Sequence, residues 1–104
     1  MTVIVCGAGA AGLMAAGTAA KYADRVILIE KNDRVGRKLR ITGKGRCNIT
    51  NSRDVAEMID MYPTNGKFLY SALYTFTNDD MVSLLEELGV KTKVERGGRI
   101  FPVS

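Results

Sequence analysis

The sequence predicts an α/β fold that begins with a parallel β-α-β unit and continues with short helices and a β-hairpin. Three observations predict this fold. Residues 2–6 read as an apolar strand that leads through a glycine-rich turn into a helix over residues 10–22. Residues 25–29 are an almost unbroken apolar run, typical of a parallel strand covered on both faces. After residue 51 the pattern changes to short amphipathic helices.

The turn after the first strand has the G-x-G-x-x-G spacing of a dinucleotide-binding fingerprint. Gly7 permits the tight turn, Gly9 lets the backbone approach a pyrophosphate, and Gly12 allows the helix to pack closely on the strands. Ala10 and Ala11 lie at the helix N-terminus, where backbone N–H groups and the helix dipole attract an anion without a cationic side chain. The turn therefore predicts a phosphate-binding role.

Glu30 follows the second strand, 18 residues after Gly12. This spacing lets the carboxylate reach the ribose hydroxyls of a bound adenosine. The glycines alone are a weak signal, because 11 glycines in 104 residues can produce the pattern by chance. Strand, glycines, helix, strand and acid in this order are more specific and predict a Rossmann-like dinucleotide-binding domain.

The second half of the chain predicts three short helices and a hairpin. Helical patterns cover residues 54–61, 67–74 and 78–88, and Thr77 with Asp80 resembles a capping box before the third. Residues 91–95 and 99–101, joined by residues 96–98, predict the hairpin. We place residues 1–51 in the dinucleotide-binding part and residues 52–104 in a helical segment with a hairpin.

No segment after residue 29 predicts a further parallel strand, so the predicted sheet is incomplete. We therefore expect the N-terminal fragment of a longer protein, whose partner is the missing remainder of that protein or a second copy docked on the uncovered sheet edges. The alternative is a complete small α+β domain, since domains of about 100 residues are common.

Composition limits the class of protein and its chemistry. Apolar residues make up 46% and charged residues 25% of the chain, as in soluble globular proteins. No apolar run approaches the ~20 residues of a membrane helix, and no basic region precedes the first apolar stretch as in a signal peptide. We expect a cytoplasmic protein without a membrane partner. The absence of histidine excludes imidazole acid–base catalysis by this chain, so redox chemistry would come from a cofactor.

The two cysteines, Cys6 and Cys47, form no C-x-x-C motif. Their separation argues against a dithiol oxidoreductase and against a zinc site, and we predict no metal. Cys6, at the end of a strand, is expected to be a small core residue. Cys47, in a polar loop, is a candidate for a redox or cofactor-contact role.

Residues 31–51 lack sustained periodicity, which predicts a loop, and residues 31–46 within it carry a concentrated positive charge. The cations are Lys31, Arg34, Arg37, Lys38, Arg40, Lys44 and Arg46, against the single acid Asp33. Such a segment can contact nucleic acid, clamp a cofactor phosphate or face solvent. The loop leaves the carboxyl edge of the predicted sheet, where the ligand crevice of an open α/β fold lies, and this favours the phosphate clamp. We expect no nucleic-acid partner, because no aromatic residue interleaves the charges.

The segment GRKLRITGKGRCNITN at residues 36–51 is long and unusual. Together with GAGAAGLMAA at residues 7–16, Glu30-Lys31 and GGRIFPVS at residues 97–104, it closely resembles the bacterial FAD flavoproteins of the BaiN-like, YhiN-like or aminoacetone-oxidase-like type. The resemblance spans essentially the whole chain. It implies an FAD-binding domain with an inserted substrate or lid region, in proteins considerably longer than this one.

The resemblance also implies roles for individual residues. Gly7, Gly9 and Gly12 would line the pyrophosphate, and Glu30 would bind the ribose hydroxyls. The residues expected beside the adenosine and over the phosphates are Lys31, Arg37 and Lys38. The residues expected to approach the ribityl chain and the flavin are Thr42, Gly43, Gly45, Arg46, Cys47 and Asn48.

The leading hypothesis is that the chain supplies the FAD-binding part of a flavin-dependent oxidoreductase acting on a small-molecule substrate. The resemblance suggests reduction of unsaturated carbonyl compounds with NAD(P)H as donor, or oxidation of small amines by oxygen. No residue is nominated as a catalytic acid or base. One alternative is a catalytically silent, truncated or split fragment that binds nucleotide only with a partner chain. Another is an NAD-dependent dehydrogenase, because Glu30 serves either dinucleotide.

Overall fold

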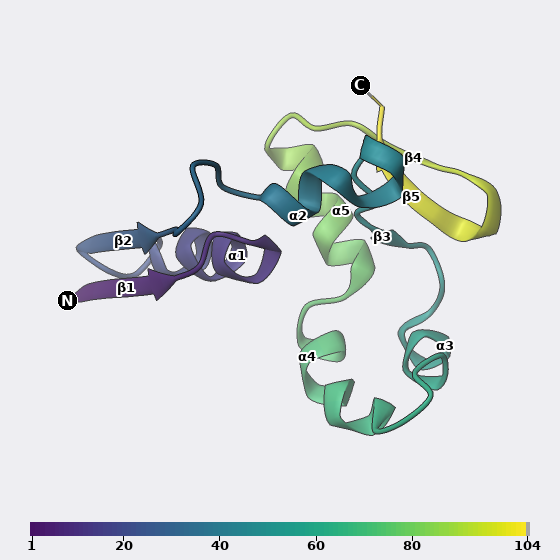
Figure 1. Cartoon of the computed structure of the whole chain (residues 1–104). Coiled ribbons are helices and arrows are strands. Elements are labelled where there is room, and N and C mark those ends of the chain that lie inside the picture. The colour runs from purple at the N-terminus through teal and green to yellow at the C-terminus, as the bar shows by residue number, and fades with distance from the viewer. Residues whose placement is uncertain (104) are drawn as a thin grey trace. The chain divides into compact units, whose positions relative to one another are not determined.

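The computed structural model describes residues 1–103, and their contacts divide them into two compact units (Figure 1). The first unit is Met1–Cys47, and the second begins at Asn48. Residues 48–51, which the sequence groups with the dinucleotide-binding part, lie in the second unit, because Thr50 and Asn51 pair with a strand there. The last residue of the GGRIFPVS segment, Ser104, lies outside the described residues.

The first unit contains the predicted parallel β-α-β arrangement (Figure 1). Strands β1 (Thr2–Cys6) and β2 (Arg25–Ile29) pair in parallel, and helix α1 (Ala10–Ala19) connects them. The helix ends at Ala19 and not at residue 22, because the hydrogen bonds after Ala19 include the shorter 3₁₀ type. The N–H of Lys21 donates to the carbonyl of Thr18 over three residues, and the N–H of Tyr22 donates to the carbonyl of Ala19.

Within residues 1–103, helix α1 covers one face of the two strands and the other face is open, which corrects the prediction of two covered faces. A Cβ built on Gly12 of α1 would lie 3.6 Å from Cγ1 of Val5, so α1 packs on the face that presents Val5. Side chains alternate between the faces of a strand. On the other face Ile4 is 59% exposed and Cys6 is exposed, so Cys6 is not the core residue that its position suggested. One helix cannot cover both faces of a sheet.

The predicted loop over residues 31–51 contains two short helices. Helix α2 covers Arg37–Ile41, and the 3₁₀ helix η1 covers Thr42–Gly45. Gly36 precedes α2 in the left-handed conformation, with φ of +64°, which glycine adopts without steric cost. Five residues are little more than one helical turn, too few to show a helical period in the sequence.

The second unit contains a three-stranded antiparallel sheet in the order β3-β5-β4. Strands β4 (Thr92–Val94) and β5 (Arg99–Pro102) form the predicted hairpin, joined through the 3₁₀ turn η3 (Arg96–Gly98). Strand β3 (Thr50–Asn51) pairs with β5 and was not predicted, because two residues carry no readable alternation. Phe101 on β5 is fully buried and Ile100 is nearly so, which places the core of this unit at β5.

Four helical segments complete the second unit (Figure 1). They are α3 (Val55–Asp60), η2 (Gly66–Leu69), α4 (Tyr70–Thr75) and α5 (Asn78–Glu87). The helix predicted over residues 67–74 is thus split into a 3₁₀ turn and an α-helix. None of the helices in residues 1–103 has the length and apolar character needed to cross a membrane.

Polar side chains at the start of α5 cap the helix and join it to the segment around β3. The predicted capping box is present: the Thr77 hydroxyl accepts the N–H of Asp80 at 3.1 Å, and the Asp80 carboxylate accepts the N–H of Thr77 at 2.9 Å. Asn78 is buried, and its Nδ2 donates to the carbonyl oxygens of Asn51 and Arg53. One amide group therefore joins the N-terminus of α5 to the segment around β3.

Candidate dinucleotide-binding site

The glycine turn between β1 and α1 is open on the side where a ligand would lie. Gly7 has φ of +99°, and a Cβ built on Gly7 or on Gly9 would meet no atom within 4 Å. Gly12 differs, because a Cβ there would lie 1.7 Å from the carbonyl oxygen of Gly7. The first two glycines leave room for a ligand to approach the backbone, and the third allows α1 to lie against the turn. This arrangement fits a bound pyrophosphate.

The N-terminus of α1 offers backbone donors without competing side chains. Gly9 is the N-cap residue, no side chain caps the helix, and its first turn contains no acid. Ala10 and Ala11 are exposed, and the first N–H groups of any α-helix have no partner within the helix. An anion at this point would meet N–H groups and the positive end of the dipole of a ten-residue helix.

Glu30 lies directly after β2, and its carboxylate is held by two backbone donors. Oε1 accepts the N–H of Ala8 at 2.8 Å, and Oε2 accepts the N–H of Asn32 at 2.8 Å. These hydrogen bonds, that of Asn32 first and that of Ala8 second, lower the pKa of Glu30 from its ordinary value. Each carboxylate oxygen can accept more than one hydrogen bond, so both remain able to accept a ribose hydroxyl.

Ala8 is the point where the turn and the following loop meet. Its side chain is 1% exposed, its N–H donates to Glu30, and its carbonyl accepts the N–H of Gly36 at 2.7 Å. A Cβ on Gly36 would contact Cδ1 of Leu13 at 3.7 Å, so this glycine also lies against α1. Both backbone groups of one residue thus tie the segment from Glu30 to Gly36 to the glycine turn.

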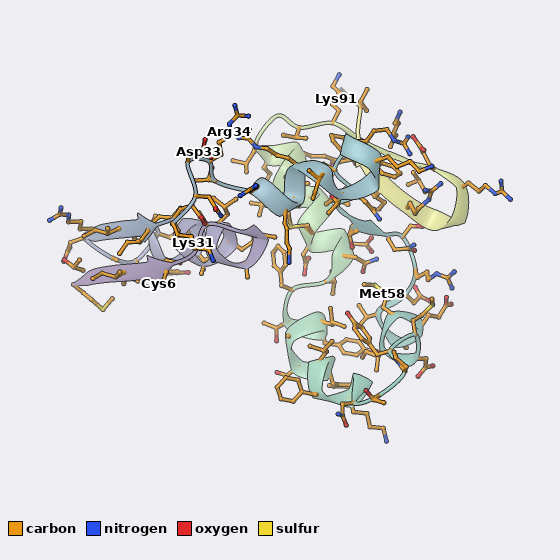
Figure 2. All side chains as sticks on the ribbon, in the orientation of Figure 1. Cys6, Lys31, Asp33, Arg34, Met58 and Lys91 are labelled. Atoms are coloured by element: carbon orange, nitrogen blue, oxygen red, sulfur yellow. The ribbon has the colours of Figure 1, made fainter. Side chains whose placement is uncertain are left out.

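The cations expected near the adenosine and the phosphates lie on and after this loop. Figure 2 shows Lys31, Asp33 and Arg34 between β2 and α2. Lys31 and Lys38 are exposed. Arg37 begins α2, and its Nη1 donates to Oδ1 of Asn32 at 3.2 Å. Of these cations, Arg37 is therefore linked by hydrogen bonds through Asn32 to Glu30.

Sequence reasoning missed Ala8, Asn32 and Gly36 as parts of this arrangement. Ala8 and Gly36 act through their backbones, and an alanine between glycines gives no sign of its hydrogen bonds. The available signal for Gly36 was a glycine inside the cation-rich segment of residues 31–46, directly before Arg37 and Lys38. Asn32 follows Glu30 by two residues, a spacing at which a carboxylate side chain can accept the backbone N–H.

The residues expected beside the flavin form a separate turn. The Thr42 hydroxyl donates to the carbonyl of Leu39 at 2.8 Å, and the N–H of Cys47 donates to the carbonyl of Thr42 at 2.9 Å. Left-handed backbone occurs at Gly43, Lys44, Gly45 and Cys47. Arg46 donates its N–H to the carbonyl of Gly43 at 3.2 Å, and Asn48 begins the second unit. These hydrogen bonds tie the segment to itself, and its role beside a flavin stays a prediction.

Comparison with known proteins agrees with this geometry. The ribosomal RNA dihydrouridine synthases of Haemophilus influenzae and Escherichia coli are 35% and 36% identical to the chain over 103 and 98 residues, each covering 94% of it. The 3-dehydro-bile acid delta(4,6)-reductase of Clostridium scindens is 32% identical over 102 residues, covering 96%. The chain spans 24% of the length of each of these relatives.

The profile of the HI0933-like protein Rossmann domain matches residues 1–104, the full length of the sequence. This family is FAD-binding. The match confirms the resemblance drawn from the GRKLRITGKGRCNITN segment and the glycine fingerprint. With its parallel β-α-β start, its open glycine turn and its acid at the end of β2, the chain belongs to the HI0933-like Rossmann-domain family.

Proposed function

We propose that this chain forms the part of a flavin-dependent oxidoreductase that binds the adenosine and pyrophosphate of FAD. The observation that carries the proposal is the junction at Ala8, where an open glycine turn and the carboxylate of Glu30 are joined by a hydrogen bond of 2.8 Å. A dinucleotide needs these two features next to each other, because its pyrophosphate and its ribose are adjacent groups.

Each part of the site has a separate task in binding. The backbone at Gly7 and Gly9 and the N-terminus of α1 would hold the pyrophosphate, and Glu30 would accept the ribose hydroxyls. Arg37 would add a charge-assisted hydrogen bond to a phosphate, and Lys31 and Lys38 would be further contacts to the adenosine and the phosphates. When bound, FAD supplies hydride or electron transfer.

The names of the relatives favour reduction over amine oxidation. A dihydrouridine synthase and a delta(4,6)-reductase both have names that describe the saturation of a ring double bond. We infer that the enzyme containing this chain reduces a carbon–carbon double bond next to a carbonyl group, with NAD(P)H as the electron donor. Such a double bond occurs in free small molecules and in the bases of RNA, so the test includes both substrate classes.

The alternative of a silent or split fragment is also testable. We propose that the open face of β1 and β2, with Ile4 59% and Ile29 50% exposed, is covered by further chain of the working enzyme. A self-associated chain would cover the same face. Light scattering of the 104-residue chain with and without the flanking sequence of its natural polypeptide distinguishes these two arrangements.

The deciding experiment uses the natural polypeptide that contains these residues. The bound nucleotide is released by heat and identified by chromatography against FAD, FMN and NAD standards. We expect stoichiometric FAD, which NADH or NADPH bleaches under anaerobic conditions. Unsaturated carbonyl steroids and unmodified ribosomal RNA are then offered as oxidants of the reduced flavin. Retention of NAD without flavin, or of neither nucleotide, would overturn the proposal.

A further inference from the structure

We propose that Asn32 is a positioning residue that holds the Glu30 carboxylate and the Arg37 guanidinium in a fixed arrangement for the adenosine diphosphate half of the dinucleotide. This inference rests on the proposed function. It adds a residue that acts on the cofactor indirectly, through Glu30 and Arg37.

Asn32 contacts the two charged groups with different atoms. Its backbone N–H donates to Oε2 of Glu30 at 2.8 Å, and its side-chain Oδ1 accepts Nη1 of Arg37 at 3.2 Å. Within residues 1–103, no ion pair joins Glu30 directly to Arg37. A neutral amide therefore connects a negative and a positive group that both belong to the candidate site.

A neutral connector preserves both charges for the ligand. If Arg37 paired directly with Glu30, the carboxylate would lose acceptor capacity for ribose hydroxyls and the guanidinium would lose donors for a phosphate. Oδ1 of Asn32 occupies one donor of the guanidinium, which has five. The remaining donors stay available, and the group is already oriented before a ligand binds.

Orientation before binding lowers the cost of binding. Arg37 is exposed, and an unrestrained exposed arginine must lose rotamer freedom when it contacts a phosphate. The loop that carries Asn32 is itself fixed at both ends, because Glu30 and Gly36 each bond to Ala8. The amide thus presents its oxygen from a rigid position, which a side chain on a free loop could not do.

The test compares half-ligands on the apoprotein of the natural polypeptide. Asn32→Ala removes Oδ1 but keeps the backbone N–H that binds Glu30. We expect the Kd for FAD and the Kd for ADP to rise by the same factor, about two- to tenfold, as for the loss of one hydrogen bond. Binding of FMN, which lacks the adenosine, should not change, and the melting temperature of the apoprotein should stay constant.

Two further variants separate positioning from other effects. Arg37→Gln should weaken FAD and ADP binding, and Asn32→Ala should add nothing in the Arg37→Gln background, because the amide acts through the guanidinium. Arg25→Gln is the matched control, since it removes an equal charge from an exposed position at the start of β2, the opposite end of that strand from Glu30. We expect Arg25→Gln to bind ADP as the unchanged protein does.

Several results would overturn the inference. Unchanged FAD and ADP affinity in Asn32→Ala would remove the positioning role, and additive losses with Arg37→Gln would show that the two residues act separately. A parallel fall in FMN affinity or in melting temperature would show a structural role alone. Unchanged protein that binds no FAD would overturn the proposed function itself, and this inference with it.

Discussion

Gly12 is the position where a single added methyl group has the clearest consequence. A Cβ at residue 12 would lie 1.7 Å from the carbonyl oxygen and 2.8 Å from the carbonyl carbon of Gly7. A carbon and an oxygen in contact are normally about 3.3 Å apart. Gly12→Ala therefore forces α1 and the glycine turn apart by roughly 1.5 Å, since the obstructing atoms belong to the backbone and cannot rotate away.

The magnitude can be worked out with Gly17 as a matched control. Gly17 lies in the same helix, and a Cβ there would meet no atom within 4 Å. Alanine favours a helix interior over glycine by about 1 kcal/mol at either position. That gain cancels in the comparison, so the difference in unfolding free energy between the two variants is the cost of overpacking, about 1–3 kcal/mol.

The assay is urea-induced unfolding of the natural polypeptide, together with the Kd for FAD. Gly17→Ala should be more stable than the unchanged protein and bind FAD normally. Gly12→Ala should unfold at a lower urea concentration with the same dependence on urea, and it should bind FAD more weakly because the phosphate-binding turn is displaced. Equal stability of the two variants would refute the close approach of α1 to Gly7.

Two further predictions concern Glu30 and Asn78. Because backbone hydrogen bonds lower its folded pKa, Glu30 contributes stability that is present above its unfolded pKa of about 4.3 and is lost as the pH falls through the folded value. In thermal melts from neutral pH downward, the melting temperatures of Glu30→Gln and of the unchanged protein should therefore converge as the pH falls below the folded pKa of Glu30. A difference in melting temperature that stays constant with pH would contradict the assignment. Asn78→Ala leaves two carbonyls without their donor and should cost about 1–3 kcal/mol in urea unfolding. Ser83→Ala, on the exposed side of the same helix, should change stability by less than about 0.5 kcal/mol, and an equal loss in both variants would refute the anchoring role of Asn78.

The elements that could be predicted have strong local signals. Strands β1 and β2 each contain four consecutive apolar residues after a polar first residue, and the predicted bounds of both match the structure. The capping box at Thr77 and Asp80 could be read because its two side chains bond within one turn. Helix α2 and strand β3 could not be read, since a five-residue helix and a two-residue strand are defined by contacts with distant residues. Gly36 is fixed by Ala8, and Thr50 pairs with Ile100.

The candidate site divides in the same way. Gly7, Gly9, Gly12 and Glu30 could be chosen from the sequence, because a side chain or its absence is what each position requires. The contribution of Ala8 lies in its N–H and C=O groups, which every residue other than proline possesses. The contribution of Asn32 depends on where Arg37 lies in space, and residue spacing in a loop does not determine that position.

The open face of the first unit affects how cofactor binding should be interpreted. The site lies at the carboxyl ends of β1 and β2, so its geometry depends on the pairing of these two strands. Ile4 and Ile29 are exposed on the open face, and covering them would stabilise the pairing of the two strands. Apparent affinity falls in proportion to the fraction of molecules in the competent state. Weak FAD binding by the isolated chain would therefore report on the coverage of this face, whereas the intact polypeptide reports on the site itself.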